Sequence, residues 1–195
     1  MGPSERRAWV WRGAASSSLP DLIHVRGRAP VLVRSCPVVS PANVLAFERA
    51  LGRALGGSPE RALELALRRA TQEHPGLVCD ERALCAALAR GCREGDPEAW
   101  LERVRAGDLL LAVCAELGQP AAVATLHRLI APEAERATRR ARVPVMDAPD
   151  LQQLVSERLL VSEPGARPKI AEYTGDGDLR GLIRVIAVRA LIAGG

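Results

Sequence analysis

The 195-residue sequence predicts an all-α protein, a compact multi-helix bundle with a disordered amino-terminal tail. Hydrophobic residues make up 48% of the chain but aromatic residues only 3%, so the core must consist of Leu, Val, Ile and Ala, which pack helix against helix. From residue 42 onward, apolar residues recur at helical spacing between residues that favour helix ends. These two observations determine the predicted fold class.

Three regions follow from this reading of the chain. Residues 1–41 are rich in Ser, Pro, Gly and Arg, with two short β-like runs, "LIHV" and "VLV", separated by "RGRAP". They predict a disordered or weakly structured tail, with a small hairpin as the alternative. Residues 42–105 predict an amino-terminal helical subdomain, and residues 106–195 a carboxyl-terminal helical domain.

The first two helices are indicated by capping residues. Ser40 or Asn43 can cap the first helix, which is expected to end at the glycine pair 56–57. Ser58 can cap the second, which has proline in its first turn and an apolar stripe that continues to His74.

Aspartates introduce the next two helices. Asp80 precedes the third, and Asp96 precedes the fourth with proline at the following position. Trp100 and Leu101 are expected to anchor the fourth helix in the core.

Four more elements complete the predicted bundle of seven or eight helices. Two helices are separated by the Gly-Gln-Pro sequence at 118–120, and Pro132 is expected to kink the second. Asp147 or Asp150 caps the next helix, and Asp178 caps the last one, which follows "TGDGD".

Composition also bears on location and partners. The formal charge of +4 permits contact with nucleic acid or an acidic protein surface without requiring either. The five cysteines form no CxxC pair and predict buried thiols in a reducing cytoplasm. The first apolar run breaks at Arg12, too soon for a signal peptide, and no run is long enough for a membrane span, so we expect a cytoplasmic protein without a membrane partner.

Chemical motifs are lacking in the sequence. The three histidines lie on different segments without a nucleophile elbow, and "TGDGD" lacks the closing glutamate of a calcium loop. Its glycines follow no strand and precede no lysine, which excludes a phosphate loop. The prediction is a protein that is not an enzyme and that has no catalytic residues, metal site or cofactor.

Arginines supply almost all the positive charge, and two groups of them are candidates for a contact with nucleic acid. Four lie at one helix end: Arg136, Arg139, Arg140 and Arg142. In the last helix, Arg180 and Arg184 are one turn apart on one face, with Arg189 less regularly placed. Either group can be a solvated surface or a contact for a phosphate backbone.

Three consecutive stretches resemble a known family. They read "GDLLLAVCAELGQPAAVATLHRLIAP", "PDLQQLVSERLLVSEPGARPKIAEY" and "TGDGDLRGLIRVIAVRA". Their order is similar to that of bacterial RNA polymerase sigma factors of the extracytoplasmic-function (sigma-70 family) type, especially divergent members of myxobacterial type, whose last stretch reads "LRxWLRVxAVR". The resemblance covers residues of about 60–191, including an amino-terminal extension, and is most specific at 150–189.

The resemblance implies a sigma-region-2-like domain in residues 106–195. Such a domain docks on the clamp helices of core RNA polymerase and presents a loop and a helix to the promoter −10 element; an anti-sigma-like regulator is a further implied partner. The implied polymerase-binding residues are Asp150, Gln152, Gln153, Ser156, Glu157 and Arg158. The implied DNA-binding residues are Tyr173, Thr174, Gly175 and Gly177 on a loop that would receive a flipped base, and Arg180, Arg184 and Arg189 on the helix.

Some residues depart from the family pattern. Asp176 and Asp178 would repel phosphate, and Leu182 stands where the family usually has tryptophan. Relatives also continue beyond "ALIAGG" into a second domain, so the sequence is either a piece of a longer sigma factor or a natural short protein. The alternative function is a helical protein-protein interaction or adaptor module without nucleic-acid binding. One contiguous basic face would favour DNA, and dispersed arginines would favour the adaptor.

Overall fold

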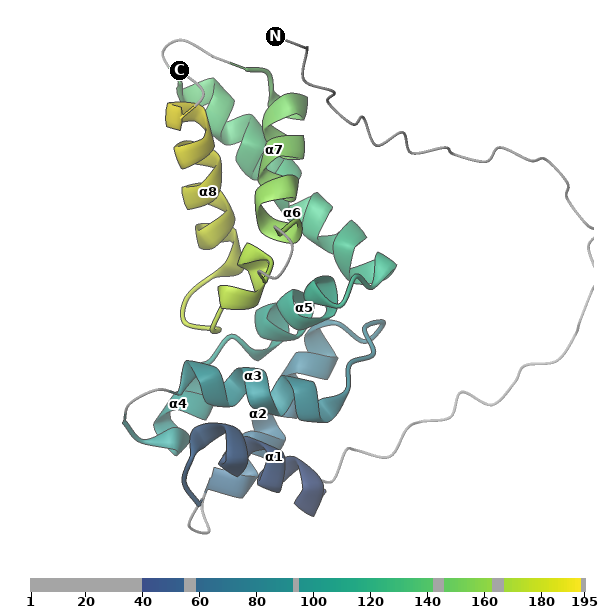
Figure 1. Cartoon of the computed structure of the whole chain (residues 1–195), viewed down its shortest axis with the longest axis vertical. Helices are drawn as coiled ribbons and strands as arrows, with labels where there is room; N and C mark the ends of the chain where they lie inside the picture. Colours follow the sequence, from purple (N-terminus) through teal and green to yellow (C-terminus); the bar gives the residue numbers. More distant parts are fainter. Residues whose placement is uncertain (1–39, 55–58, 93–94, 142–145, 163–166, 194–195) are drawn as a thin grey trace, which may run out of the picture. The chain divides into compact units, whose positions relative to one another are not determined.

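A computed structural model describes residues 40–54, 59–92, 95–141, 146–162 and 167–193. Within these ranges the chain forms eight α-helices, one short 3-10 helix and no strand, which confirms the predicted fold class (Figure 1). The elements are α1 (Pro41–Leu51), α2 (Pro59–Glu73), α3 (Glu81–Gly91), α4 (Pro97–Arg103), α5 (Ala106–Glu116), α6 (Pro120–Arg140), α7 (Ala148–Leu160), η1 (Lys169–Glu172) and α8 (Leu179–Ala193). The predicted tail and its β-like runs lie almost entirely outside the described residues.

Helix α5 lies at the centre of the packing. Its sequence, AGDLLLAVCAE, is apolar almost all round, as expected for a helix covered on every side. It packs against α2, α3, α6 and η1, and every residue from Leu109 to Ala115 is buried. The described helices all belong to one compact unit, residues 34–195, and α5 links the amino-terminal helices to those that follow. The subdomain boundary predicted at residue 105 stays a prediction.

Helix α1 ends earlier than predicted. It ends at Leu51, because Gly52 adopts the left-handed conformation (φ 75°) and its N–H closes on the Glu48 carbonyl. The glycine pair 56–57, where the end was predicted, lies outside the described residues. Of the two alternatives for the start of α1, Ser40 occupies the N-cap position, without a side-chain capping hydrogen bond. Asn43 is buried inside α1 and donates a hydrogen bond to Glu81 at the start of α3.

The aspartate caps are confirmed. Asp80, Asp96 and Asp178 each accept a hydrogen bond from the backbone two residues later, at 3.1, 3.1 and 3.0 Å. Of the two alternatives for α7, Asp147 is the cap, since its carboxylate accepts from the Asp150 N–H at 2.9 Å. Trp100 is buried as predicted, and its indole donates to the Leu88 carbonyl at 3.1 Å.

Helices α6, α7 and α8 pack pairwise against one another and form what we call the carboxyl-terminal bundle (Figure 1). Each contributes an apolar stripe at helical spacing: Leu126, Ile130 and Ala134 on α6, Leu151, Val155 and Leu159 on α7, and Ile183, Ala187 and Ala190 on α8. The residues named by the family resemblance lie on α7, on α8 or on the loop between η1 and α8.

Candidate interaction surfaces of the carboxyl-terminal bundle

The outer face of α7 carries the six residues that the resemblance links to polymerase. We call it the α7 face: Asp150, Gln152, Gln153, Ser156, Glu157 and Arg158. All are exposed except Gln152 and Ser156, which are half-buried. The opposite side of the helix is buried against α6 and α8, so the bundle itself holds this polar face outward.

Hydrogen bonds of the α7 face are local. The Gln153 amide donates to the Glu157 carboxylate at 2.9 Å, one turn away, and the Ser156 hydroxyl donates to the Gln152 carbonyl at 2.8 Å. Neither bond reaches another helix. The face can therefore bind a partner without breaking a contact that holds the bundle together.

The loop at 173–178 is tied to α5 by Tyr173. The tyrosine side chain is buried, and its hydroxyl donates to the Gly177 carbonyl at 2.6 Å and lies 3.5 Å from Asp108 Oδ2. Burial raises the pKa of Tyr173 above its ordinary value, and the negative charges of Asp108 and Asp178 add to this. In this conformation the ring is part of the core and does not offer a stacking surface.

Backbone contacts fix the same loop. The Arg105 N–H donates to the Gly175 carbonyl at 3.0 Å, and the Leu179 N–H donates to Asp108 Oδ2 at 3.1 Å. Gly175 has a φ of 84°, and a Cβ placed there would come within 2.6 Å of Val104 Cγ2. The residue must be glycine both for its conformation and for this close approach.

The remaining loop residues differ in exposure. Thr174 is half-buried, whereas Asp176, Gly177 and Asp178 are exposed. The exposed side chains of the loop are thus acidic, which is unfavourable for a phosphate contact. The DNA-binding role of the loop stays a prediction.

Glu133 on α6 was not singled out by the sequence. Its side chain is only 1% exposed and pairs with two arginines: Arg136 Nη1 lies 2.6 Å from one carboxylate oxygen, and Arg184 Nε lies 2.9 Å from the other. The hydrogen bond from Arg184, together with the charges of both arginines, holds the pKa of Glu133 below its usual value, although burial opposes this. A signal was present, because Glu133 continues the buried α6 stripe of Leu126 and Ile130 at helical spacing.

A hollow of about 230 Å³ lies beside this ion-pair network, between α6 and α8. We call it the α6–α8 groove. Arg136, Arg140 and Arg184 form its rim. Its other lining residues are Glu133 and the apolar Ala137, Ala141, Val188, Leu191 and Ile192.

The structure brings part of the two predicted arginine groups together. Arg136 and Arg140 of α6 meet Arg184 of α8 at the groove, and Arg180 is exposed one turn before Arg184. Arg139 does not line the groove and pairs with Glu135 at 3.3 Å. Arg142 lies outside the described residues.

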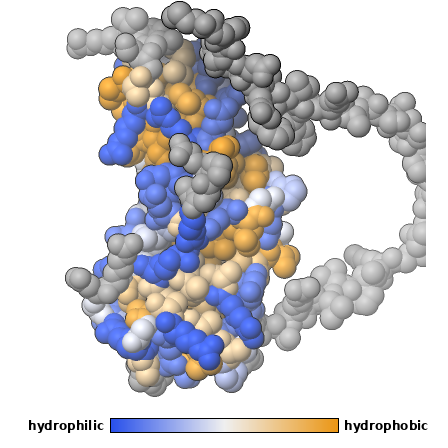
Figure 2. All heavy atoms as spheres, viewed as in Figure 1, coloured by the Kyte–Doolittle hydropathy of each residue, from blue (hydrophilic) through white to orange (hydrophobic). Residues whose placement is uncertain are grey.

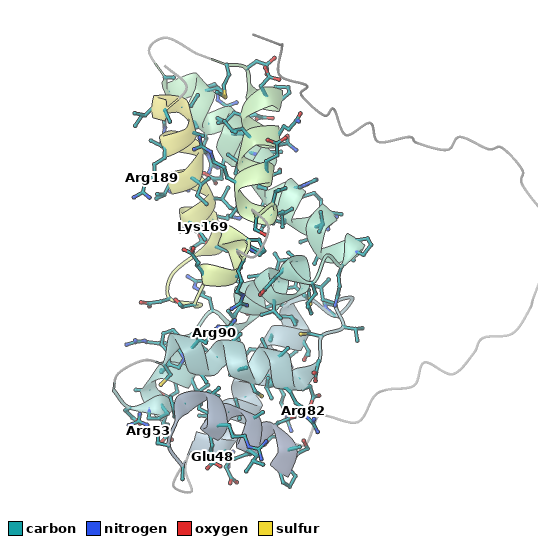
Figure 3. The ribbon with its side chains drawn as sticks, in the orientation of Figure 1. Glu48, Arg53, Arg82, Arg90, Lys169 and Arg189 are labelled. Carbon is teal, nitrogen blue, oxygen red and sulfur yellow. The ribbon has the colours of Figure 1, made fainter. Side chains whose placement is uncertain are left out.

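Arg189 lies apart from this group. It follows Arg184 by five residues, which places it about 140° further round the helix. Its side chain extends outward from α8 (Figure 3). The three arginines predicted on α8 therefore do not form a single stripe.

Exposed apolar residues accompany the arginines on α8. Val185 and Val188 are nearly half exposed, and Ile192 is 74% exposed. Figure 2 shows hydrophobic residues among hydrophilic ones over the carboxyl-terminal part of this helix. The surface is thus amphipathic rather than uniformly basic.

The described residues include neither a reactive thiol nor a cluster of metal ligands. Cys85, Cys92 and Cys114 are buried free thiols and Cys79 is half-buried, while Cys36 lies outside. Burial raises the pKa of Cys79 and of Cys85 to about 12, which makes their thiols unreactive. In the same ranges, no three His, Cys, Asp or Glu side chains are grouped to hold a metal ion.

No single described helix is long and apolar enough to cross a membrane. Taken together across their 118° bend, α5 and α6 reach that length and composition, and α5 is the buried central helix.

Comparison with known proteins identifies no relative. No protein-family model matches this sequence, and no curated protein or solved structure matches it significantly.

Proposed function

We propose that the chain is a cytoplasmic transcription factor that docks on core RNA polymerase through the α7 face, and that the basic surface of α8 contacts promoter DNA. The proposal rests on the sigma-factor resemblance of the sequence. In this proposal the protein acts by binding and catalyses no reaction.

The observation that carries the proposal is that the α7 face is exposed and makes no hydrogen bond to another described helix. All six residues that the resemblance assigns to polymerase lie on α7 outside its buried stripe of Leu151, Val155 and Leu159, and four of them are exposed. Their hydrogen bonds stay within α7, while Leu151, Val155 and Leu159 fix the helix from behind. A rigid helix with a free polar face is well suited to docking, because little order is lost on binding.

The proposed contact with DNA is supported by the arginines of α8 and their neighbours on α6. Arg180 is exposed near the start of α8, and Arg184 meets two α6 arginines at the groove. This partial clustering is what a phosphate contact needs. Glu133 reduces the field of Arg184 and Arg136, so we assign Arg180 the larger share of any backbone contact.

The test is a pull-down of bacterial core RNA polymerase on the immobilised full chain. We expect the wild-type chain to retain polymerase, and the double charge reversal Glu157→Arg/Arg158→Glu to lower the affinity by about tenfold or more, since reversed charges at a docked face cost at least 1.4 kcal/mol. Net charge is unchanged in this variant, so the loss would not come from long-range attraction.

A matched control exists on α2. Glu60→Arg/Arg61→Glu reverses an adjacent exposed pair far from α7 in the sequence and should retain polymerase like the wild type. Equal retention by both double variants would exclude docking through α7. Failure of the wild-type chain to retain polymerase would reject the proposal as a whole.

The second candidate is a helical adaptor without nucleic-acid binding. It is favoured by the burial of Tyr173, which leaves an acidic loop surface where a base would have to bind. Titration with single-stranded promoter DNA separates the two candidates: the first requires binding that weakens with salt and on Arg180→Ala, because each phosphate contact contributes about one to the salt slope. Absence of such binding by a chain that retains polymerase would leave the adaptor.

A further inference from the structure

The α6–α8 groove combines an apolar lining with a basic rim, and we infer that it binds an acidic amphipathic helix of a partner protein. This site is distinct from the α7 face, whose residues do not line it. The inference rests on the groove itself and does not require polymerase binding.

Two apolar residues of the groove are exposed. Val188 and Ile192 lie one turn apart on α8 and are 44% and 74% exposed, and Leu191 between them is half-buried. Ala137 of α6 has a small side chain and leaves room between the helices. Exposed apolar side chains gathered at a hollow are typical of a binding surface.

The rim determines the charge of the partner. Three guanidinium groups face one carboxylate, so the groove keeps a positive charge after Glu133 is paired. The side chains of Arg136 and Arg184 remain about half exposed, at 48% and 50%. Because each guanidinium has five N–H donors, both can bind a further carboxylate without releasing Glu133.

A protein helix fits this combination better than nucleic acid does. A phosphate backbone would meet the arginines but would leave Val188 and Ile192 without an apolar contact. An amphipathic helix brings apolar side chains at spacings of three and four, flanked by Asp or Glu, and lies in a groove between two helices. The α6–α8 groove offers complementary groups for both kinds of side chain.

The probe for this inference is a synthetic, fluorescein-labelled helix of Glu, Leu and Ala of about twenty residues, long enough to be helical in water. Its binding to the full chain is measured by fluorescence anisotropy. We expect binding that a matched peptide with Lys in place of every Glu loses by about tenfold or more, since charge complementarity across the rim is reversed.

Two pairs of variants locate the site. Arg140→Glu should weaken binding about tenfold, whereas Arg139→Glu, on the same helix but outside the groove, should change it less than about twofold. Ile192→Ser should weaken binding about fivefold through lost apolar burial, and Leu117→Ser, at another exposed apolar position after α5, should have no effect. All four side chains are exposed, so the variants are expected to fold.

The α7 variant Glu157→Arg/Arg158→Glu should bind the peptide like the wild type. Because this variant changes the α7 face and leaves the α6–α8 groove intact, its peptide binding tests the groove independently of whether the chain retains polymerase.

Four outcomes would overturn the inference. Equal affinity for the Glu and Lys peptides would exclude selection by charge, and equal losses in Arg139→Glu and Arg140→Glu would place the site elsewhere. Dimerisation of the chain that Ile192→Ser abolishes would make a second copy the occupant. Displacement of the peptide by single-stranded DNA, with DNA binding lost in Ile192→Ser, would assign the groove to nucleic acid.

Discussion

The loop at 173–178 and the α7 face are both polar, and both belong to the carboxyl-terminal part of the chain, yet they are held in opposite ways. The loop is joined to α5 through Tyr173, Gly175 and Asp108, with partners up to 71 residues away. The α7 face makes hydrogen bonds only one turn along its own helix. Polar residues therefore stabilise the fold in the first region and are free for a partner in the second.

The two loop glycines give the sharpest test of this contrast. Gly175 and Gly177 both have positive φ, but only at Gly175 would a Cβ meet another residue. We expect Gly177→Ala to lower the free energy of unfolding by about 1 kcal/mol through backbone strain, and Gly175→Ala by about 3 kcal/mol because a clash with Val104 is added. Urea denaturation measures both, and equal losses would mean that the loop is not packed closely on the α4–α5 junction.

Alkaline titration is the next test, because Tyr173 is the single tyrosine of the chain. The pKa of Tyr173 is raised in the folded protein above the ordinary 10.0. The buried neutral tyrosine therefore contributes fully to the free energy of unfolding below pH 10, and this contribution is lost as the pH rises above that value. The phenolate absorbance should appear at higher pH in the folded chain than in urea.

Two variants control this titration. Asp108→Asn should shift the folded-state pKa part of the way back, since burial remains. Tyr173→Phe should remove the phenolate signal and cost about 1 kcal/mol for the lost hydroxyl hydrogen bond. A tyrosine that titrates at its ordinary pH in the folded wild type would show that the loop is open.

Substitutions on the α7 face should change the stability of the fold least. Glu157→Arg/Arg158→Glu is expected to change the free energy of unfolding by less than about 0.5 kcal/mol, as for other exposed surface changes. Thermal unfolding by circular dichroism is sufficient to measure it. A loss as large as that of Tyr173→Phe would mean that the face contributes to the fold after all.

The sequence predicted features that depend on neighbouring residues. The caps Asp80, Asp96 and Asp178 and the buried Trp100 follow from spacing within one or two turns, and all are present. The end of α1 was misplaced because Gly52 and the pair 56–57 both suit a helix end, and propensity alone does not choose between them.

The sequence did not predict features that depend on distant partners. Nothing near Glu133 reveals that Arg184, 51 residues later, will reach its carboxylate. The same holds for Asp108, which joins the loop to α5 across 71 residues. The resemblance implies that Tyr173 lies on a loop that would receive a flipped base, whereas the structure buries its side chain.

The pairing of Glu133 also bears on how the chain is made. At typical rates of synthesis, of about 5–20 residues per second, Arg184 is added roughly 3–10 seconds after Glu133. During that interval Arg136, one turn away on α6, is the cation at hand for the glutamate. Arg136 is therefore the first counterion available to Glu133 and keeps that contact in the folded chain, and Arg184 can join it only after α8 has been synthesised.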